Sequence, residues 1–101
     1  MGNPVVMYAT SWCGYCRRAR QLLTAKGVPF TEIDVDQVQG GRAQMEQRSG
    51  RTTVPQIFIG ATHVGGYDDL RVLDERGGIE PLLDARPEQD QQKTNTEEPR
   101  P

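Results

Sequence analysis

The chain has little of what defines several large protein classes. Its 101 residues include only two cysteines, one histidine and one tryptophan, and no apolar run approaches the length of a membrane span. Two cysteines are too few for a disulfide-scaffolded secreted domain, and a closed zinc site of four cysteines needs twice as many. A membrane-crossing helix needs about 20 consecutive apolar residues. The sequence therefore argues against disulfide-rich, zinc-ribbon and membrane-spanning proteins.

The chain also lacks a large excess of charge of either sign. Its formal net charge is −2, and 26% of its residues are charged, with both signs mixed along the sequence. We therefore expect no general attraction to nucleic acid or to anionic membranes. The segment 1–8 has no basic stretch ahead of its apolar run. We accordingly expect no secretory signal peptide and a cytoplasmic location, where thiols stay reduced.

Apolar and polar positions in the first half predict a strand, a helix and a second strand. The continuous apolar run Val5–Tyr8 is typical of a strand that is buried on both faces. Apolar residues at helical spacing between Cys16 and Leu23 predict a helix that ends at Gly27. The segment Val28–Asp36 then alternates, which predicts the second strand.

The next segments predict a weaker helix and a hairpin. The polar stretch Gln39–Ser49 favours a helix with Ala43 and Met45 as its inward residues. Two short apolar runs, Gln56–Ile59 and Thr62–Val64, are separated by a glycine and an alanine and predict two antiparallel strands.

The chain is predicted to end in helical turns and a tail. Leucines within Asp68–Arg76 favour a helix, and Ile79–Leu83 favours a further turn with Pro81 tolerated at its start. Residues 86–101 contain no aliphatic or aromatic side chain, so we expect a disordered tail after a single domain spanning 1–85. The order β-α-β-α-β-β-α, with a final turn, predicts an α/β fold with a four-stranded mixed sheet flanked by helices.

The two cysteines lie where a strand gives way to a helix. Cys13 should therefore lie at the helix N-terminus, where unpaired N–H groups and the helix dipole favour a thiolate. In such motifs the thiol pKa falls from about 8.5 to roughly 3.5–7. Cys13 is the predicted nucleophile, and Cys16, one turn further on, is its predicted resolving partner. Arg17 and Arg18 add a minor positive charge.

The cysteine pair could also be a buried inert couple or half of a metal site. Zinc would need two further ligands, and His63 is the only histidine in the chain. A lone histidine in a short strand is more often packed or exposed than a ligand. We therefore expect no metal held by the side chains of this chain.

Two further elements suggest a groove beside the cysteines. Pro55 belongs at a strand start, where a trans bond is the commoner form. A cis bond would instead turn the backbone of Val54 outward to pair with an extended, peptide-like thiol. Further along, a glycine pair precedes Asp68 and Asp69, so free N–H groups and two carboxylates would suit an α-carboxylate and an α-amino group. Simple capping of the following helix is the alternative.

Together these residues resemble the class I dithiol glutaredoxins of the short bacterial type, from about Val5 to Leu83. The resemblance rests on the two-cysteine motif, the segment from Arg48 to Ile59 and the segment from Gly65 to Leu70. It implies a thioredoxin-like fold, a cis Pro55 and glutathione as co-substrate. It assigns glutathione binding to Tyr15, Thr53, Val54, Pro55, Gly66, Tyr67, Asp68 and Asp69.

The resemblance implies a thiol–disulfide oxidoreductase that reduces protein–glutathione mixed disulfides and protein disulfides. It implies a monomer whose partners are glutathione and such proteins. Three alternatives remain open. The chain could carry a [2Fe–2S] cluster through Cys13 and glutathione across a dimer, it could use another reductant as mycoredoxins and thioredoxins do, or it could be an interaction module.

The sequence departs from the family pattern at two positions. Gly14 replaces the usual proline after the first cysteine, and Thr10 replaces a lysine that commonly lies three residues before it. The glycine makes the loop more flexible. The threonine removes a cation that would meet the glycyl carboxylate of glutathione, and Arg51 and Arg42 are two candidates for its replacement.

Overall fold

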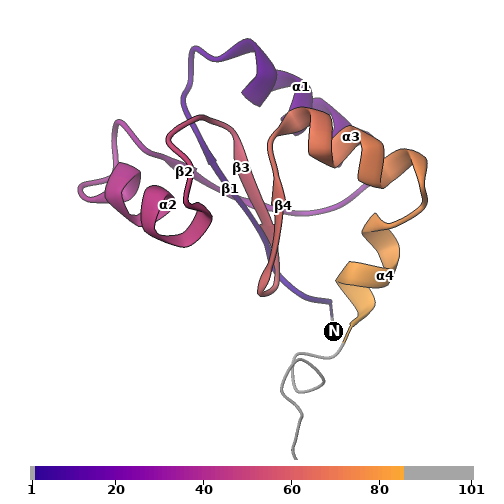
Figure 1. Ribbon diagram of the computed structural model, residues 1–101. Helices are drawn as coiled ribbons and strands as arrows, with labels where there is room; N and C mark the ends of the chain where they lie inside the picture. The colour runs from indigo at the N-terminus through magenta and orange to yellow at the C-terminus, as the bar shows by residue number, and fades with distance from the viewer. Residues whose placement is uncertain (1, 86–101) are drawn as a thin grey trace, which may run out of the picture.

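Strands and helices alternate in the first half of the chain, and a hairpin and two helices follow (Figure 1). The computed structural model describes residues 2–85, so the predicted disordered tail and its boundary lie outside the described residues. The elements are β1 (Val5–Ala9), α1 (Gly14–Ala25), β2 (Thr31–Asp34), α2 (Gly41–Ser49), β3 (Gln56–Ile59), β4 (Thr62–Gly65), α3 (Tyr67–Glu75) and α4 (Ile79–Asp84).

The four strands form one mixed sheet in the order β2-β1-β3-β4. Strand β1 pairs with β2 in parallel and with β3 antiparallel, and β3 and β4 form the antiparallel hairpin. The central position of β1 explains its unbroken apolar run, because side chains on both of its faces are covered. The predicted α/β architecture and element order are confirmed.

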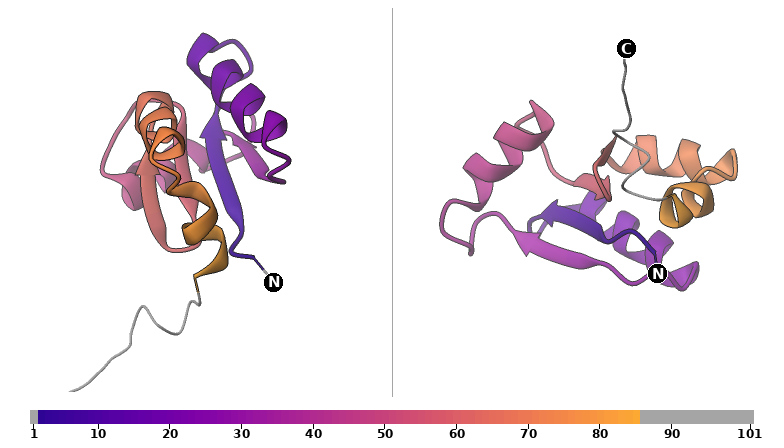
Figure 2. Two further views of the ribbon diagram at one scale, coloured as in Figure 1. Left: turned by 90° about the vertical axis from the view of Figure 1, so that its right-hand side faces the viewer. Right: turned by 90° about the horizontal axis from the view of Figure 1, so that it is seen from below.

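Helices cover both faces of the sheet (Figure 2). Helices α1, α3 and α4 pack on one face, where alternate residues of β1 and β3 point into the larger core. Helix α2 lies on the other face, where Met45 packs against Tyr8 and Phe58. Within residues 2–85, no helix is long and apolar enough to span a bilayer.

The predicted second strand is too long at both ends. Strand β2 begins at Thr31 because the residues before it close the preceding helix. Gly27 has a φ of +71°, and the N–H of Val28 donates to the carbonyl of Leu23 at 2.9 Å. These are the bonds of a glycine-ended helix, so Val28 is not available to the sheet.

The prediction that Ala43 faces inward is wrong. Met45 is fully buried, but Ala43 is exposed. Residues four apart share one face of a helix, so the buried partner of Met45 is Gly41, and position 43 lies on the opposite side. The helix also begins later than Gln39 because Gly40, with a φ of +75°, precedes its first turn.

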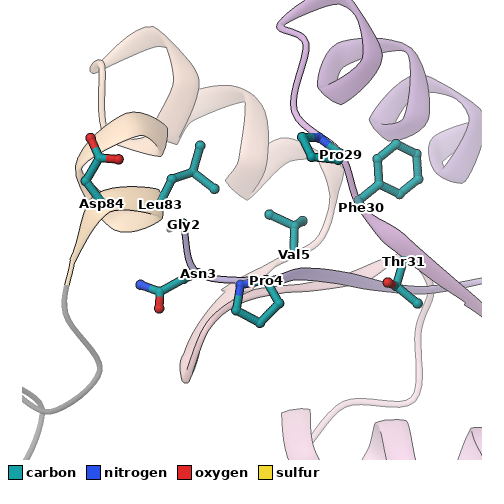
Figure 3. A pocket seen from close by; sticks show the side chains of 9 residues that line it. All are labelled: Gly2, Asn3, Pro4, Val5, Pro29, Phe30, Thr31, Leu83 and Asp84. Atoms are coloured by element: carbon teal, nitrogen blue, oxygen red, sulfur yellow. The ribbon is translucent and has the colours of Figure 1, made fainter.

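The N-terminal segment is tied to the last helix. The backbone N–H of Asn3 donates to the carbonyl of Leu83 at 2.7 Å. Its side-chain amide donates to the carbonyls of Leu82 and Ala85 at 2.9 and 2.7 Å. A hollow of about 540 Å³ lies between this segment, the start of β2 and α4 (Figure 3). It lies at the opposite end of β1 from the cysteines.

Candidate active site

Cys13 lies between the central strand and the first helix. Strand β1 ends at Ala9, and after a short loop Cys13 is the N-cap of α1, with an extended backbone at φ −85° and ψ 126°. Its carbonyl accepts the N–H of Arg17 at 3.1 Å. The predicted position at a helix N-terminus is confirmed.

The surroundings of Cys13 favour its thiolate. Partial burial raises the pKa of this thiol, but four groups together outweigh burial and hold the pKa below its ordinary value. They are the backbone N–H and the thiol of Cys16, the backbone N–H of Tyr15 and the positive charge of Arg20. The sulfur lies 3.9 Å from the carbonyl oxygen of Val54, to which the protonated thiol donates.

The surroundings of Cys16 favour its protonated thiol instead. Cys16 is fully buried, and its pKa is raised to about 11. Burial is the largest cause, Cys13 adds to the rise, and the backbone N–H of Thr10 opposes it. Both cysteines are free thiols. Since only a thiolate attacks a disulfide, the difference favours Cys13 as the first nucleophile and leaves Cys16 protonated until Cys13 has reacted.

Arg20 is the cation whose charge lowers the pKa of both thiols, and sequence reasoning missed it. Its guanidinium forms a two-pronged ion pair with Glu32 at 2.7 and 2.6 Å and donates to the carbonyl of Thr10 at 3.0 Å. Arg17 and Arg18, to which the sequence assigned only a minor effect, are exposed. The missed signal was spacing, because residue 20 lies one helical turn after Cys16.

A groove of about 180 Å³ opens beside Cys13. It brings together all eight residues to which the resemblance assigned glutathione binding, and it adds Arg51 and Gln56. Its lining consists of Tyr15, Arg51, Thr53, Val54, Pro55, Gln56, Gly66, Tyr67, Asp68 and Asp69. The Val54–Pro55 peptide bond is cis, as the resemblance implied.

The acidic end of the groove combines capping with an exposed charge pair. Asp69 accepts the N–H of Gly66 at 3.0 Å, so the capping alternative is realised at the start of α3. The same oxygen lies 3.4 Å from Arg51, with both side chains about half exposed. Of the two candidates for the missing cation, Arg51 lines this groove, whereas Arg42 pairs with Asp36 at 3.0 Å on another part of the surface.

Aromatic side chains border the thiol. Tyr15 is 56% exposed, and its ring lies 6.5 Å from that of Tyr67. Trp12, directly before Cys13, is 74% exposed. A partner molecule that approaches the sulfur therefore meets uncovered aromatic surface on the loop itself.

His63 is engaged within the protein. Its Nε2 lies 2.7 Å from the side-chain oxygen of Gln56. In the part of the chain that the structure describes, no three His, Cys, Asp or Glu side chains come close enough together to hold a metal ion.

Comparison with known proteins places this geometry in a family. A family model described as glutaredoxin matches residues 5–64. The chain is 55% identical over 82 residues to a glutaredoxin of Pseudomonas aeruginosa, across 81% of this chain and 98% of that protein. It is 56% identical over 79 residues to glutaredoxin 3 of Escherichia coli, across 78% and 95%. The chain belongs to the glutaredoxin family.

Solved glutaredoxins share its fold. The crystal structure of a buckwheat glutaredoxin–glutathione complex superposes with a TM-score of 0.73 at 36% identity, across 80% of this chain and 76% of that one. The predicted thioredoxin-like fold is thereby confirmed. As a glutaredoxin, the protein is a glutathione-dependent thiol–disulfide oxidoreductase.

The glycine in the glutaredoxin motif gives a first prediction. We expect Gly14→Pro to raise the free energy of unfolding by about 0.4–1 kcal/mol. The extended backbone of Cys13 suits a residue before proline, and position 14 is the first of the helix. A Cβ there would meet no atom within 4 Å. The N–H groups that lower the pKa of Cys13 belong to Tyr15 and Cys16, so the proline removes neither.

Urea unfolding of the reduced protein measures this effect. Gly14→Ala is the control, because it adds a Cβ without fixing φ. A proline variant that is less stable than the wild-type protein would contradict the prediction.

A second prediction concerns the glycine beside the acidic end of the groove. We expect Gly65→Ala to lower the free energy of unfolding by about 1–3 kcal/mol and to weaken glutathione-dependent turnover. Gly65 has a φ of +118°, and a Cβ there would overlap the carboxylate of Asp69. Gly77→Ala is the matched control, because Gly77 also has a positive φ, +70°, but its Cβ would meet nothing within 4 Å. Equal losses in the two variants would show that the contact with Asp69 has no effect.

Proposed function

We propose that Cys13 is the nucleophile that reduces protein–glutathione mixed disulfides and protein disulfides. The observation that carries the proposal is the partly exposed Cys13, with a lowered pKa, whose sulfur lies 3.9 Å from the carbonyl oxygen of Val54 in the groove lining. The thiolate attacks the glutathione sulfur of a mixed disulfide, a new disulfide forms between Cys13 and glutathione, and the protein leaves as a thiolate. A second glutathione thiolate attacks this disulfide, releasing oxidised glutathione and the Cys13 thiolate.

For a protein disulfide, Cys16 completes the reaction. Attack by Cys13 joins the two proteins and releases one thiolate of the substrate. Cys16 then loses its proton and attacks the Cys13 sulfur, which releases the second substrate thiolate and leaves a Cys13–Cys16 disulfide for two glutathiones to reduce. Part of the raised pKa of Cys16 comes from Cys13 itself. That part disappears once Cys13 is covalently bound, so the second thiol becomes easier to ionise when it is needed.

The groove suggests how glutathione lies. The backbone of Val54, with Thr53 beside it, pairs with the cysteinyl residue of glutathione, in the manner of an added strand. Asp68, Asp69 and the N–H groups at the start of α3 take the γ-glutamyl end. Arg51 lies beside Asp69 at this acidic end, and Tyr15 and Tyr67 border the thiol.

The biological setting that suits this chemistry is the cytoplasm. There the chain would act as a monomer, with glutathione and glutathionylated or disulfide-containing proteins as partners. A glutathione pool keeps the two thiols reduced between turnovers.

An assay with three reductants tests the proposal. Reduction of a glutathionylated peptide is followed through NADPH, with glutathione and glutathione reductase, with thioredoxin reductase, or with mycothiol and its reductase. We expect turnover with glutathione to exceed the other two. Turnover with thioredoxin reductase or mycothiol alone would assign the chain another reductant.

A second candidate is a [2Fe–2S] cluster held between two copies of the chain. The open space around Gly14 and the partial exposure of Cys13 favour it. Within residues 2–85 no three metal-ligating side chains come close enough together to hold a metal ion, so each copy would supply Cys13 and bind one glutathione as a further ligand. Visible absorbance of anaerobically purified dimer supports this candidate, and an active colourless monomer counts against it.

A further inference from the structure

We propose that His63 is a positioning residue for disulfide exchange, acting through the side chain of Gln56 on Thr53 and Val54. The inference rests on the proposed role of Thr53 and Val54 in holding glutathione. It assigns a function to the single histidine, which the reaction itself does not use.

The amide of Gln56 links the two residues. Gln56 begins β3 and is 1% exposed. Its Nε2 donates to both the carbonyl oxygen and the hydroxyl oxygen of Thr53, at 3.0 and 3.2 Å. Its Oε1 lies 2.7 Å from Nε2 of His63. All the polar atoms of a buried amide are thus directed to two residues.

These contacts determine which side-chain atoms of Gln56 and His63 carry the hydrogens. If the amide of Gln56 were reversed, its oxygen would face the carbonyl oxygen of Thr53, and neither atom carries a hydrogen. The amide oxygen therefore faces His63, and Nε2 of His63 must donate. Neutral His63 is accordingly the Nε2–H tautomer, and the same hydrogen bond survives protonation of the ring.

The ring of His63 is held by packing. His63 in β4 is paired with Phe58 in β3, and the two rings stack with centroids 4.9 Å apart and planes 28° from parallel. The guanidinium of Arg48 lies 4.0 Å from the centroid of the Phe58 ring. The donor of His63 is therefore presented to Gln56 from a fixed ring rather than from a mobile side chain.

These contacts extend from His63 through Gln56 and Thr53 to the sulfur of Cys13. Thr53 is itself exposed, so its inward hydrogen bonds from Gln56 restrain a segment that solvent would otherwise leave free. The next residue, Val54, has its carbonyl oxygen 3.9 Å from Cys13 Sγ. Without the donor of His63, the buried oxygen of Gln56 loses its partner, and the amide must turn away from Thr53 or remain unsatisfied. Glutathione would then bind to a less ordered segment.

Two variants of His63 separate this role from simple packing. His63→Phe keeps a ring for stacking on Phe58 but removes the donor, whereas His63→Gln keeps a side-chain N–H that can reach Gln56. A buried polar atom left unpaired corresponds to about a 5- to 160-fold change in an equilibrium. We expect the KM of the phenylalanine variant for a glutathionylated peptide to rise by about this factor, and that of the glutamine variant by less.

The measurements are kcat and KM for both variants, the Cys13 pKa from thiolate absorbance, and the ¹⁵N shifts of His63 in the wild-type protein. We expect kcat and the Cys13 pKa to be unchanged, because the N–H donors to Cys13 belong to α1. We expect shifts of the Nε2–H tautomer. An unchanged KM in folded His63→Phe, an equal rise in both variants, or an Nδ1–H tautomer would overturn the inference.

The nitrogen shifts decide the inference if the phenylalanine variant does not fold. They also separate it from the proposed function. A wild-type protein without glutathione-dependent turnover counts against that function alone, and the tautomer still shows whether His63 donates to Gln56.

Discussion

Cys13→Ser is expected to abolish reduction of a glutathionylated peptide, whereas Cys16→Ser is expected to retain most of it. The serine hydroxyl at position 13 is not ionised at neutral pH, so no nucleophile remains, and turnover should fall by about 10³-fold or more. Cys16 is fully buried, and the proposed exchange with a mixed disulfide does not use it. The measurement is the rate of NADPH oxidation coupled through glutathione reductase.

A protein disulfide is the matched second substrate. There Cys16→Ser should stop the reaction at a covalent complex between the two proteins, which non-reducing electrophoresis detects. Equal activity of Cys13→Ser and wild type on either substrate would contradict the assignment of the nucleophile. Loss of both activities in Cys16→Ser, with the fold intact, would show that resolution is obligatory.

The two thiols are expected to differ by at least about 100-fold in their rates of alkylation at pH 7. A thiol with a pKa of about 11 is ionised in only about one molecule in 10⁴ at that pH. The pKa of Cys13 lies below its ordinary value, so a far larger share of this thiol is ionised. Mass spectrometry after limited exposure to iodoacetamide should find the label on Cys13.

The pH dependence of the alkylation rate shows in which direction the pKa of each thiol is shifted. As pH falls below the ordinary thiol range, Cys13 should keep reacting until pH passes its lowered pKa. Cys16 should react faster as pH rises into the alkaline range. The urea-unfolded protein is the control, because both thiols are then in water and should react alike. Preferential labelling of Cys16 in the folded protein would contradict the geometry.

The architecture could be predicted from the sequence because it follows from local periodicity. An unbroken apolar run marked β1 as a central strand, and a two-residue gap between short apolar runs marked the hairpin of β3 and β4. The position of Cys13 followed in turn, since a cysteine between a buried strand and a helix must lie at the helix start. The same local reasoning failed for Ala43, because a weakly apolar helix gives few positions from which to fix its inward face.

The support of the site could not be predicted in the same way. Gln56 and His63 are polar residues whose mutual hydrogen bond exists only once β3 and β4 have paired. Arg20 depends likewise on Glu32, twelve residues later and in another strand. Residue type and spacing indicate which atoms attack, but side-chain contacts between elements decide how those atoms are held.

The tie between Asn3 and the end of α4 brings the first and last described residues to one end of the molecule, as Figure 1 shows. Strand β1 begins just after Asn3, and Cys13 follows its other end. A fluorescent reporter or affinity label attached next to Asn3 or at Ala85 should therefore lie at the end of the molecule remote from the sulfur. Immobilised in this way, the protein would present its reactive loop outward to large substrates.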